Sequence, residues 1–231
     1  MKLGNEETLQ RIKGGLIVSC QALPEEPLHS SFIMGRMALA ASQAGAVGIR
    51  ANTVADIKEI RNMVDLPIIG IIKKVYDDCP DVYITPTIAE VDALTACGVE
   101  IIATDAPRRD RPGGETIETF FSKVRAKFPD QLFMADCSNV EEGMEAAALG
   151  FDLIGTTMAS YTPYTRGCPL PPFDMIEYLV KNCGKPVVAE GNIITPEHLR
   201  HAMDLGVLTA VVGSAITRPL EITKRFVAVL K

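Results

Sequence analysis

Two charged residues each close an apolar run, and they are the first candidates for chemistry. Lys73 follows "PIIGII" (67–72) and Glu190 follows "PVVA" (186–189). Short apolar runs of this kind indicate buried strands, so both charges would sit where water is scarce. Loss of hydration lowers the pKa of an amine and raises that of a carboxylic acid, which brings both towards neutrality. The pair therefore predicts proton transfer, with Lys73 as a usable general base and Glu190 as a proton donor.

Other polar residues also stand at or just beyond the ends of apolar runs. They are Gln21, Arg50, Asp105, Asp136, Thr156, Thr157, Gly213 and Ser214. If the runs are parallel strands, these side chains meet at one edge and form a site there. A purely structural role stays open for several of them, since Arg50 and Asp136 could form an ion pair and Asp105 could cap a loop. The same Lys73 could instead form a Schiff base with a carbonyl substrate.

Two glycine-containing segments, "EGN" (190–192) and "VGSAITRP" (212–219), follow the last two apolar runs. Paired loops of this kind bind phosphate in many barrels through backbone N–H groups and a helix N-terminus. Arg218 could add a cation to such a site. The alternative is that Gly191 and Gly213 only permit tight turns.

Strands and helices alternate along the whole sequence. Eight runs of strand type are predicted at 15–20, 47–51, 67–73, 99–106, 132–137, 151–158, 186–191 and 209–215, with eight helical segments between or after them. Glycines recur where a helix gives way to a strand, at Gly45, Gly98, Gly150 and Gly206, which indicates a repeated unit. Continuous apolar strands point to a parallel sheet covered by helices, so we predict a single (β/α)₈ barrel, a TIM barrel of the phosphate-binding type. An open doubly wound sheet is the alternative, but its usual glycine fingerprint is missing.

Composition narrows the function further. The 231 residues carry a net charge of −6, which argues against nucleic acid and anionic membranes as partners. No leader or membrane span is expected, and six scattered cysteines suggest reduced thiols, so we expect a cytoplasmic protein. The cysteines lack the spacing of metal ligands, and His198 and His201, three apart on one helix, are expected away from the mouth, so we expect no metal site. We expect one domain over 1–231, with 1–14 as an N-terminal helical extension.

Nine ordered segments resemble one family, the N-acetylmannosamine-6-phosphate 2-epimerases of bacterial amino-sugar and sialic acid catabolism. They are "SCQALPEEPL", "GIRANTVADI", "PIIGIIKK", "ITPTIAEVDAL", "TDAPRRDRP", "MADCSNVEEG", "GTTMASYTPYT", "AEGNIITPE" and "VVGSAITRP". The resemblance runs from about residue 15 to residue 230.

The resemblance implies an isomerase that works as a carbohydrate epimerase on a (β/α)₈ phosphosugar barrel. Such enzymes interconvert N-acetylmannosamine 6-phosphate and N-acetylglucosamine 6-phosphate without a cofactor. By motif, Lys73 and Glu190 are the proton-transfer pair. The substrate-binding residues are Gln21, Arg50, Asp136 and Arg218, and the phosphate-binding residues are Gly191, Asn192, Gly213 and Ser214. A homodimer is compatible with the sequence but not determined by it.

Three places depart from the usual wording of the family: Pro107, Cys137, and the segment Met158-Ala159-Ser160. They stand beside the expected mouth of the barrel, where they bear on contacts to the sugar rather than on the reaction class. Two alternatives to an epimerase are a Schiff-base aldolase and a catalytically silent phosphosugar sensor. Trapping by borohydride and exchange of the C2 hydrogen distinguish the three.

Overall fold

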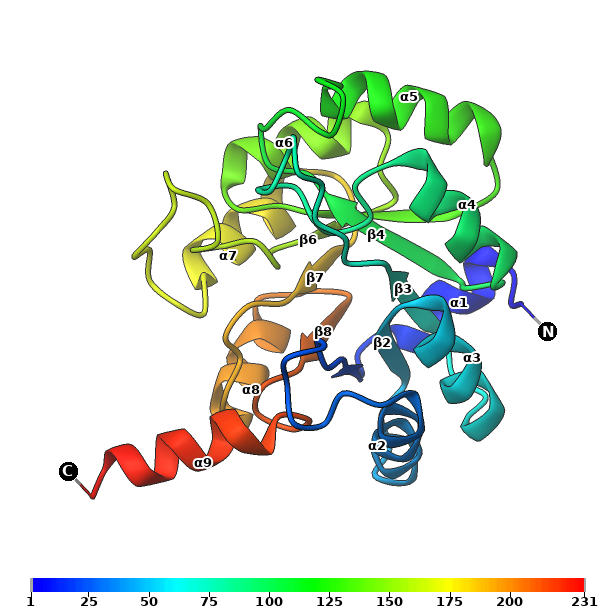
Figure 1. Cartoon of the computed structure of the whole chain (residues 1–231). Coiled ribbons are helices and arrows are strands. Elements are labelled where there is room, and N and C mark those ends of the chain that lie inside the picture. Colours follow the sequence, from blue (N-terminus) through cyan, green and yellow to red (C-terminus); the bar gives the residue numbers. More distant parts are fainter. Residues whose placement is uncertain (1, 231) are drawn as a thin grey trace.

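Eight parallel strands close into a barrel in the structure, a computed structural model that describes residues 2–230. The strands are β1 (Leu16–Cys20), β2 (Gly48–Asn52), β3 (Ile68–Ile71), β4 (Ile101–Asp105), β5 (Leu132–Asp136), β6 (Leu153–Gly155), β7 (Val187–Ala189) and β8 (Thr209–Val212). Each strand pairs in parallel with its neighbours in sequence, and β8 returns to β1. The predicted (β/α)₈ barrel and its eight strands are thus confirmed (Figure 1).

Helices follow every strand, and one more precedes β1. The helices are α1 (Asn5–Ile12), α2 (Ser31–Gln43), α3 (Val54–Met63), α4 (Ile88–Ala96), α5 (Ile117–Lys127), α6 (Val140–Leu149), α7 (Phe173–Asn182), α8 (Pro196–Asp204) and α9 (Pro219–Ala228). Five of them begin after a Thr or Asn whose side chain accepts a hydrogen bond from an N–H of the first turn. These caps satisfy donors that the helix itself leaves free, so they fix where the helices start.

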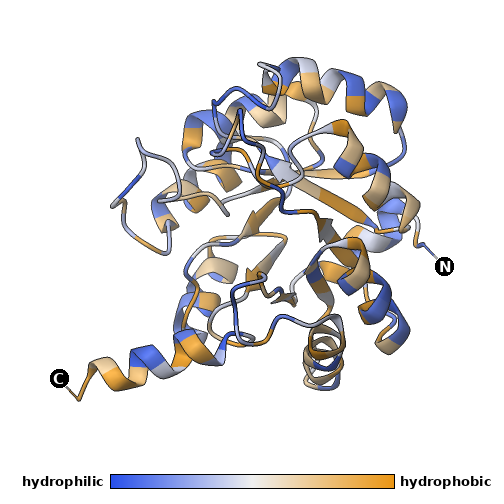
Figure 2. Ribbon diagram, viewed as in Figure 1, coloured by the Kyte–Doolittle hydropathy of each residue, from blue (hydrophilic) through white to orange (hydrophobic). Residues whose placement is uncertain are grey.

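Side chains alternate between two apolar layers along each strand. Ile17, Ile69 and Ile101 point into the barrel, whereas Val18, Ile68 and Ile102 pack outward against the helices. Ile12 of α1 belongs to the inner layer, so α1 contributes a side chain to the barrel interior although it is not part of the sheet. Figure 2 shows apolar strands at the centre and helices with polar residues among their apolar ones.

The repeated glycines end helical segments as the sequence predicts. Gly45, Gly98, Gly150 and Gly206 have φ values of 96°, 70°, 97° and 94°. In this left-handed region a side chain would clash with the backbone, so glycine is the natural residue there. The turns let each helix run back into the next strand of the barrel.

The register of the strands brings the central polar residues to one level. Arg50 of β2 pairs with Ser19 of β1, and Asp136 of β5 pairs with Gly155 of β6. A Cβ atom on Gly155 would lie 2.3 Å from Met134 Cε and 3.3 Å from Asp136 Oδ1. The glycine therefore leaves the room in which Asp136 reaches the interior.

The last helix stands apart from the barrel wall. In Figure 1, α9 extends away from the body of the protein, and none of its residues is buried. Phe226 on this helix is an exposed apolar side chain, as are Val229 and Leu230 just after its end. Among the described residues, no helix is both long and apolar enough to cross a membrane.

Candidate active site

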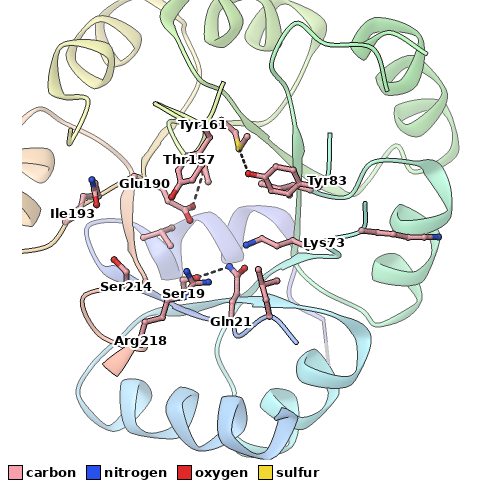
Figure 3. A pocket seen from close by; sticks show the side chains of 18 of the residues that line it. Ser19, Gln21, Lys73, Tyr83, Thr157, Tyr161, Glu190, Ile193, Ser214 and Arg218 are labelled. Atoms are coloured by element: carbon pink, nitrogen blue, oxygen red, sulfur yellow. Dashed lines mark hydrogen bonds between the residues drawn. The ribbon is translucent and has the colours of Figure 1, made fainter. Parts of the chain in front are cut away.

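A cavity of about 580 Å³ opens at the C-terminal ends of the strands. Its volume is typical of sites for small molecules. Its lining includes Ser19, Gln21, Leu23, Lys73, Tyr83, Ile84, Thr157, Met158, Tyr161, Glu190, Gly191, Asn192, Ile193, Gly213, Ser214 and Arg218. Figure 3 shows Lys73 and Glu190 entering this space from different sides of the barrel. Eight of the ten predicted site residues are therefore brought together; the exceptions are Arg50 and Asp136.

Lys73 lies just beyond β3, where its backbone N–H donates to Asn52 Oδ1 at 2.8 Å. Burial is the main cause that lowers the pKa of the amine to about 8, and the cations Arg50 and Arg218 lower it further. The carboxylates Glu190 and Asp136 act in the opposite direction. At neutral pH, a useful fraction of the amine is therefore free of its proton and able to act as a base.

Glu190 follows β7 and has a side chain that is 13% exposed. Burial raises the pKa of its carboxyl group to about 7, although Arg50 favours the charged form. Thr157 Oγ1 lies 3.2 Å from Glu190 Oε2, and Thr156 Oγ1 both donates to the Glu190 carbonyl and accepts from its N–H. The carboxyl group is thus held in place with a pKa suited to giving or taking a proton.

Arg50 and Asp136 lie beneath the cavity floor instead of lining it. Their side chains are 1% and 0% exposed, and they form a two-pronged ion pair with N–O distances of 2.6 and 3.1 Å. Arg50 Nη1 also donates to Glu190 Oε2 at 2.8 Å. The ion pair that the sequence left open as a structural role is present. Its geometry lets Arg50 act on the site through Glu190.

Gln21 offers an acceptor at the opposite side of the cavity from Glu190 (Figure 3). Its Nε2 donates to Ser19 Oγ at 2.8 Å, but its buried Oε1 has no partner among the described residues. A buried acceptor without a partner costs free energy, so the site favours a ligand or water that donates a hydrogen bond there. Ser19 stands two residues before Gln21, and residues at this spacing share a face of a strand. That spacing is the signal by which sequence reasoning could have found Ser19.

The loops after β7 and β8 present backbone donors to the cavity. Within residues 2–230, the N–H groups of Gly191, Asn192, Gly213 and Ser214 have no acceptor at hydrogen-bond distance. Gly191 and Asn192 have φ values of 116° and 58°, a sharp turn typical of such loops. Unpaired N–H groups beside a cavity form a site for an anion.

Arg218 is the cation nearest to these donors along the chain, and it lines the same cavity. Its side chain is 31% exposed, and its Nε lies 3.2 Å from Glu26 Oε1 in the loop after β1. Glu26 Oε2 also accepts from the N–H of Leu23 at 2.7 Å. One carboxylate thus joins the guanidinium to the loop that forms part of the cavity wall.

Asp105 was expected at the mouth, but it lies behind the cavity wall. It is 1% exposed, and its Oδ2 accepts from the N–H groups of Tyr83 and Ile84 at 2.6 and 2.7 Å. Tyr83 and Ile84 line the cavity although no strand ends near them, so the strand-end pattern gave no signal for either. Their presence in the site depends on how the loop after β3 folds back.

The three departures from the family wording occupy different environments. Met158 lines the cavity and lies 3.9 Å from Tyr83 Oη through its sulfur atom. Cys137 is fully buried in the layer between sheet and helices, and Pro107 is buried in the loop after β4. Of the three, only the segment that begins at Met158 contributes to the cavity.

Comparisons with known proteins agree with this geometry. Residues 34–231 match the family described as "Putative N-acetylmannosamine-6-phosphate epimerase". Curated relatives are named "Putative N-acetylmannosamine-6-phosphate 2-epimerase". One of them, from Clostridium perfringens, is 55% identical over 96% of this chain and 100% of the relative. Another from Lactiplantibacillus plantarum is 51% identical over 96% of this chain and 98% of the relative.

Solved structures lead to the same family. The N-acetylmannosamine-6-phosphate 2-epimerase of Clostridium perfringens superposes with a TM-score of 0.91 at 54% identity, over 96% of this chain and 95% of that one. A thiamine phosphate pyrophosphorylase from Pyrococcus furiosus, with a TM-score of 0.60 and 19% identity, shares the fold alone. The chain belongs to the N-acetylmannosamine-6-phosphate epimerase family.

Proposed function

We propose that this chain is an isomerase that inverts C2 of N-acetylmannosamine 6-phosphate to give N-acetylglucosamine 6-phosphate, in sialic acid and amino-sugar degradation. The observation that carries the proposal is the pair of proton carriers in one cavity. Lys73 and Glu190 have pKa values of about 8 and about 7 and come from opposite strands, β3 and β7. Family membership supports the choice of substrate.

The reaction begins when the sugar ring opens and frees an aldehyde at C1. The C2 hydrogen is then acidic, because the charge left by its removal spreads onto the aldehyde oxygen as an enolate. One member of the pair takes the proton from one face of C2, and the other gives a proton to the opposite face. One proton leaves and one returns, so the step needs neither oxidant nor reductant.

Lys73 suits one face of C2 and Glu190 suits the other. Once protonated, the Lys73 ammonium adds positive charge beside the developing enolate, which lowers the barrier electrostatically. Arg50 is engaged with Asp136 and Glu190, so its role is to hold the Glu190 carboxyl and set its charge. Gln21 Oε1 accepts from a sugar hydroxyl or the acetamido N–H.

The phosphate group binds at the loops after β7 and β8 in this proposal. The free N–H groups of Gly191, Asn192, Gly213 and Ser214 donate to its oxygens, and Arg218 adds a positive charge. Binding energy from the phosphate then holds C2 between the two proton carriers. No metal or cofactor has a part in this mechanism.

Proton NMR in D₂O tests the proposal directly. The protein is incubated with N-acetylmannosamine 6-phosphate, and the C2 and anomeric signals of both epimers are followed. We expect N-acetylglucosamine 6-phosphate with deuterium at C2, and no reaction in Lys73→Met or Glu190→Gln. Lys58→Met is the matched control, because Lys58 is exposed on α3 and does not line the cavity. A substrate that keeps both its configuration and its C2 hydrogen would rule the proposal out.

A Schiff-base aldolase is the competing chemistry, because an amine with a pKa of about 8 is also a nucleophile. Borohydride reduces an imine between Lys73 and a carbonyl substrate to a stable secondary amine. Mass spectrometry of the intact protein after such treatment would then show the added mass. For an epimerase working by proton transfer we expect no adduct while C2 exchange proceeds.

We further propose a homodimer formed through α9. Phe226 on α9 and Val229 and Leu230 just after it are 73%, 81% and 83% exposed, and neighbouring exposed apolar side chains of this kind mark protein–protein contact sites. Sedimentation equilibrium of the wild type should give twice the chain mass, and Phe226→Asp should give the mass of one chain. A wild-type monomer would refute this part.

Activity in the cytoplasm is the last part of the proposal. All six cysteines are free, including the buried Cys20 and Cys137, which suits a reducing compartment. Fractionation of cells that express the chain should recover the epimerase activity with the cytoplasmic proteins.

A further inference from the structure

The position of Lys73 depends on a chain segment beyond β3. The strand ends at Ile71, and the chain then turns and comes back antiparallel to itself, so that Lys73 pairs with Ile84. Lys74 N donates to Tyr83 O at 2.9 Å, and Thr85 N donates to Ile72 O at 2.8 Å. The segment Tyr83–Thr85, called the return segment below, is thus the partner that orders the backbone around Lys73.

Asp105, at the end of β4, holds the return segment from its other side. Its Oδ2 accepts the N–H groups of Tyr83 and Ile84 at 2.6 and 2.7 Å, and its own N–H donates to Ile84 O at 2.9 Å. A single carboxylate oxygen with two N–H donors is a strong, charge-assisted anchor. The two donors have no other acceptor recorded among the described residues, so loss of the carboxylate leaves them unpaired.

The return segment also forms part of the cavity wall beside Lys73. Tyr83 and Ile84 line the cavity together with Lys73, and Ile84 is 2% exposed within the inner apolar layer. Burial is the largest cause of the lowered pKa of Lys73. A return segment that moved away would let water reach the amine and raise that pKa towards its ordinary value.

We propose that Asp105 is a positioning residue for Lys73: it anchors the return segment so that the amine stays in place and shielded from water. The inference rests on the proposed proton transfer by Lys73. Asp105 does not line the cavity and has no role in contact with substrate. Its effect travels through two backbone hydrogen bonds and the Lys73–Ile84 pairing.

Geometry and charge can be separated at this site. The largest effects of charge on the Lys73 amine come from Arg50, Arg218, Glu190 and Asp136. The charged groups that face Asp105 are Arg109, with Nη2 at 3.6 Å from Oδ1, and Arg111, which binds the Asp105 carbonyl. Asp105→Asn keeps an oxygen for both N–H groups but removes the charge, whereas Asp105→Ala removes both. The positioning role therefore predicts that Asn rescues what Ala loses, apart from a small cost of placing its NH₂ beside Arg109.

The experiment combines two measurements: the titration of the Lys73 amine and the rate of epimerisation. In protein labelled with ¹³Cε-lysine, the Lys73 signal is assigned by its loss in Lys73→Arg and followed by NMR as the pH changes. Epimerisation kinetics are measured for the wild type, Asp105→Ala, Asp105→Asn and the control Asp110→Ala. Asp110 stands on the loop that follows β4, and its exposed side chain makes no hydrogen bond within residues 2–230.

We expect Asp105→Ala to lower kcat about 100-fold, the typical result of moving a catalytic group by about 1 Å, with KM changed by less than about threefold. The Lys73 titration midpoint should move up in the same variant. Asp105→Asn should stay within about tenfold of the wild-type kcat and keep the midpoint near its original value. Asp110→Ala should match the wild type in both measurements.

Several outcomes would overturn the inference. A Lys73 midpoint unchanged in Asp105→Ala would show that the return segment does not depend on this carboxylate. Equal losses in Asp105→Asn and Asp105→Ala would assign the effect to charge. If Asp105→Ala does not fold, Asp105→Ser replaces it, since a hydroxyl on the shorter side chain cannot reach both N–H groups. An inactive wild type would instead count against the proposed function, while the titration would still decide the role of Asp105.

Discussion

Arg50 Nη1 donates a hydrogen bond of 2.8 Å to Glu190 Oε2, from a guanidinium that also grips Asp136 in the barrel interior. One buried cation is therefore shared between a carboxylate that stays below the cavity and a carboxyl group that lines it. Burial raises the pKa of Glu190 and Arg50 lowers it, and the balance lies at about 7. Arg50 in the barrel interior thus helps to set the pKa of Glu190 in the cavity.

Replacement of Arg50 should lower the free energy of unfolding of the protein. Arg50→Met leaves the buried Asp136 carboxylate without its partner, and a broken buried ion pair of this kind typically costs about 3–5 kcal/mol. Urea denaturation at pH 7 measures the loss. Arg200→Met is the control, because the Arg200–Asp204 pair is 79% and 62% exposed and exposed pairs contribute at most about 1 kcal/mol. Similar losses of free energy of unfolding in the two variants would contradict the proposal that the buried Arg50 ion pair stabilises the protein.

The pH dependence of epimerisation should follow the Lys73–Glu190 pair. Proton transfer needs one proton on the pair, either as neutral amine with carboxylic acid or as ammonium with carboxylate. With pKa values of about 7 and about 8, the pair with one proton is most abundant between these values. Because both assignments hold the same number of protons, kcat/KM should be bell-shaped in both directions of reaction, with coupled limbs that belong to the pair.

Rates measured from about pH 5.5 to 9.5 test this profile. Activity should fall below about pH 7 as Glu190 gains a proton while Lys73 stays charged, and above about pH 8 as both lose theirs. A rate that stays constant across the whole range would exclude the pair as the groups that move the proton.

The buried amine of Lys73 should lower the free energy of unfolding of the protein. Its pKa in the folded protein is about 8, against 10.5 for the ordinary side chain, so the folded state resists the charged form. Between these two values the unfolded chain binds more protons than the folded one, so the wild type gains stability as pH rises. Lys73→Met should thus be more stable than the wild type at pH 7, by about 1–3 kcal/mol.

Urea denaturation of the wild type and Lys73→Met, at pH 7 and near pH 10.5, measures the difference in stability between the two proteins. The advantage of Lys73→Met should be full below about pH 8 and should shrink as pH rises towards 10.5. Lys58→Met, at an exposed position on α3, should show no such dependence. An advantage that persists unchanged at high pH would mean that packing, not the buried charge, is responsible.

Arg218 should contribute to binding of the phosphate and little to the chemistry. Arg218→Gln removes a cation beside the free N–H groups of the β7 and β8 loops, and charge-assisted bonds of this kind are worth about 1.5–3 kcal/mol. We expect KM for the phosphosugar to rise about 10- to 100-fold with a smaller change in kcat. The measurement is repeated with N-acetylmannosamine, which lacks the phosphate, and the rate with this sugar should not respond to the substitution. Equal effects on both sugars would place Arg218 away from the phosphate.

Much of the site could be predicted because its residues carry local signals. Lys73 and Glu190 each follow an apolar run, and Gly191 and Gly213 follow the last two strands, so a barrel requires them to meet at one mouth. Period, caps and glycines fix the order of strands and helices within a few residues of chain. For these features the sequence is sufficient, since the physics that produces them acts between near neighbours.

Only the tertiary structure decided how these residues are supported. Arg50 reaches Asp136 and Glu190 across 86 and 140 residues of chain, and it lies below the cavity although its strand position suggested the lining. The return segment that pairs with Lys73 is placed by Asp105 from a different strand. Such contacts depend on strand register and on which side chains share the dry interior, and neither is encoded in a short stretch of sequence. The sequence indicated most of the groups that enter the site, and long-range packing determined the rest, together with their neighbours, their burial and hence their pKa values.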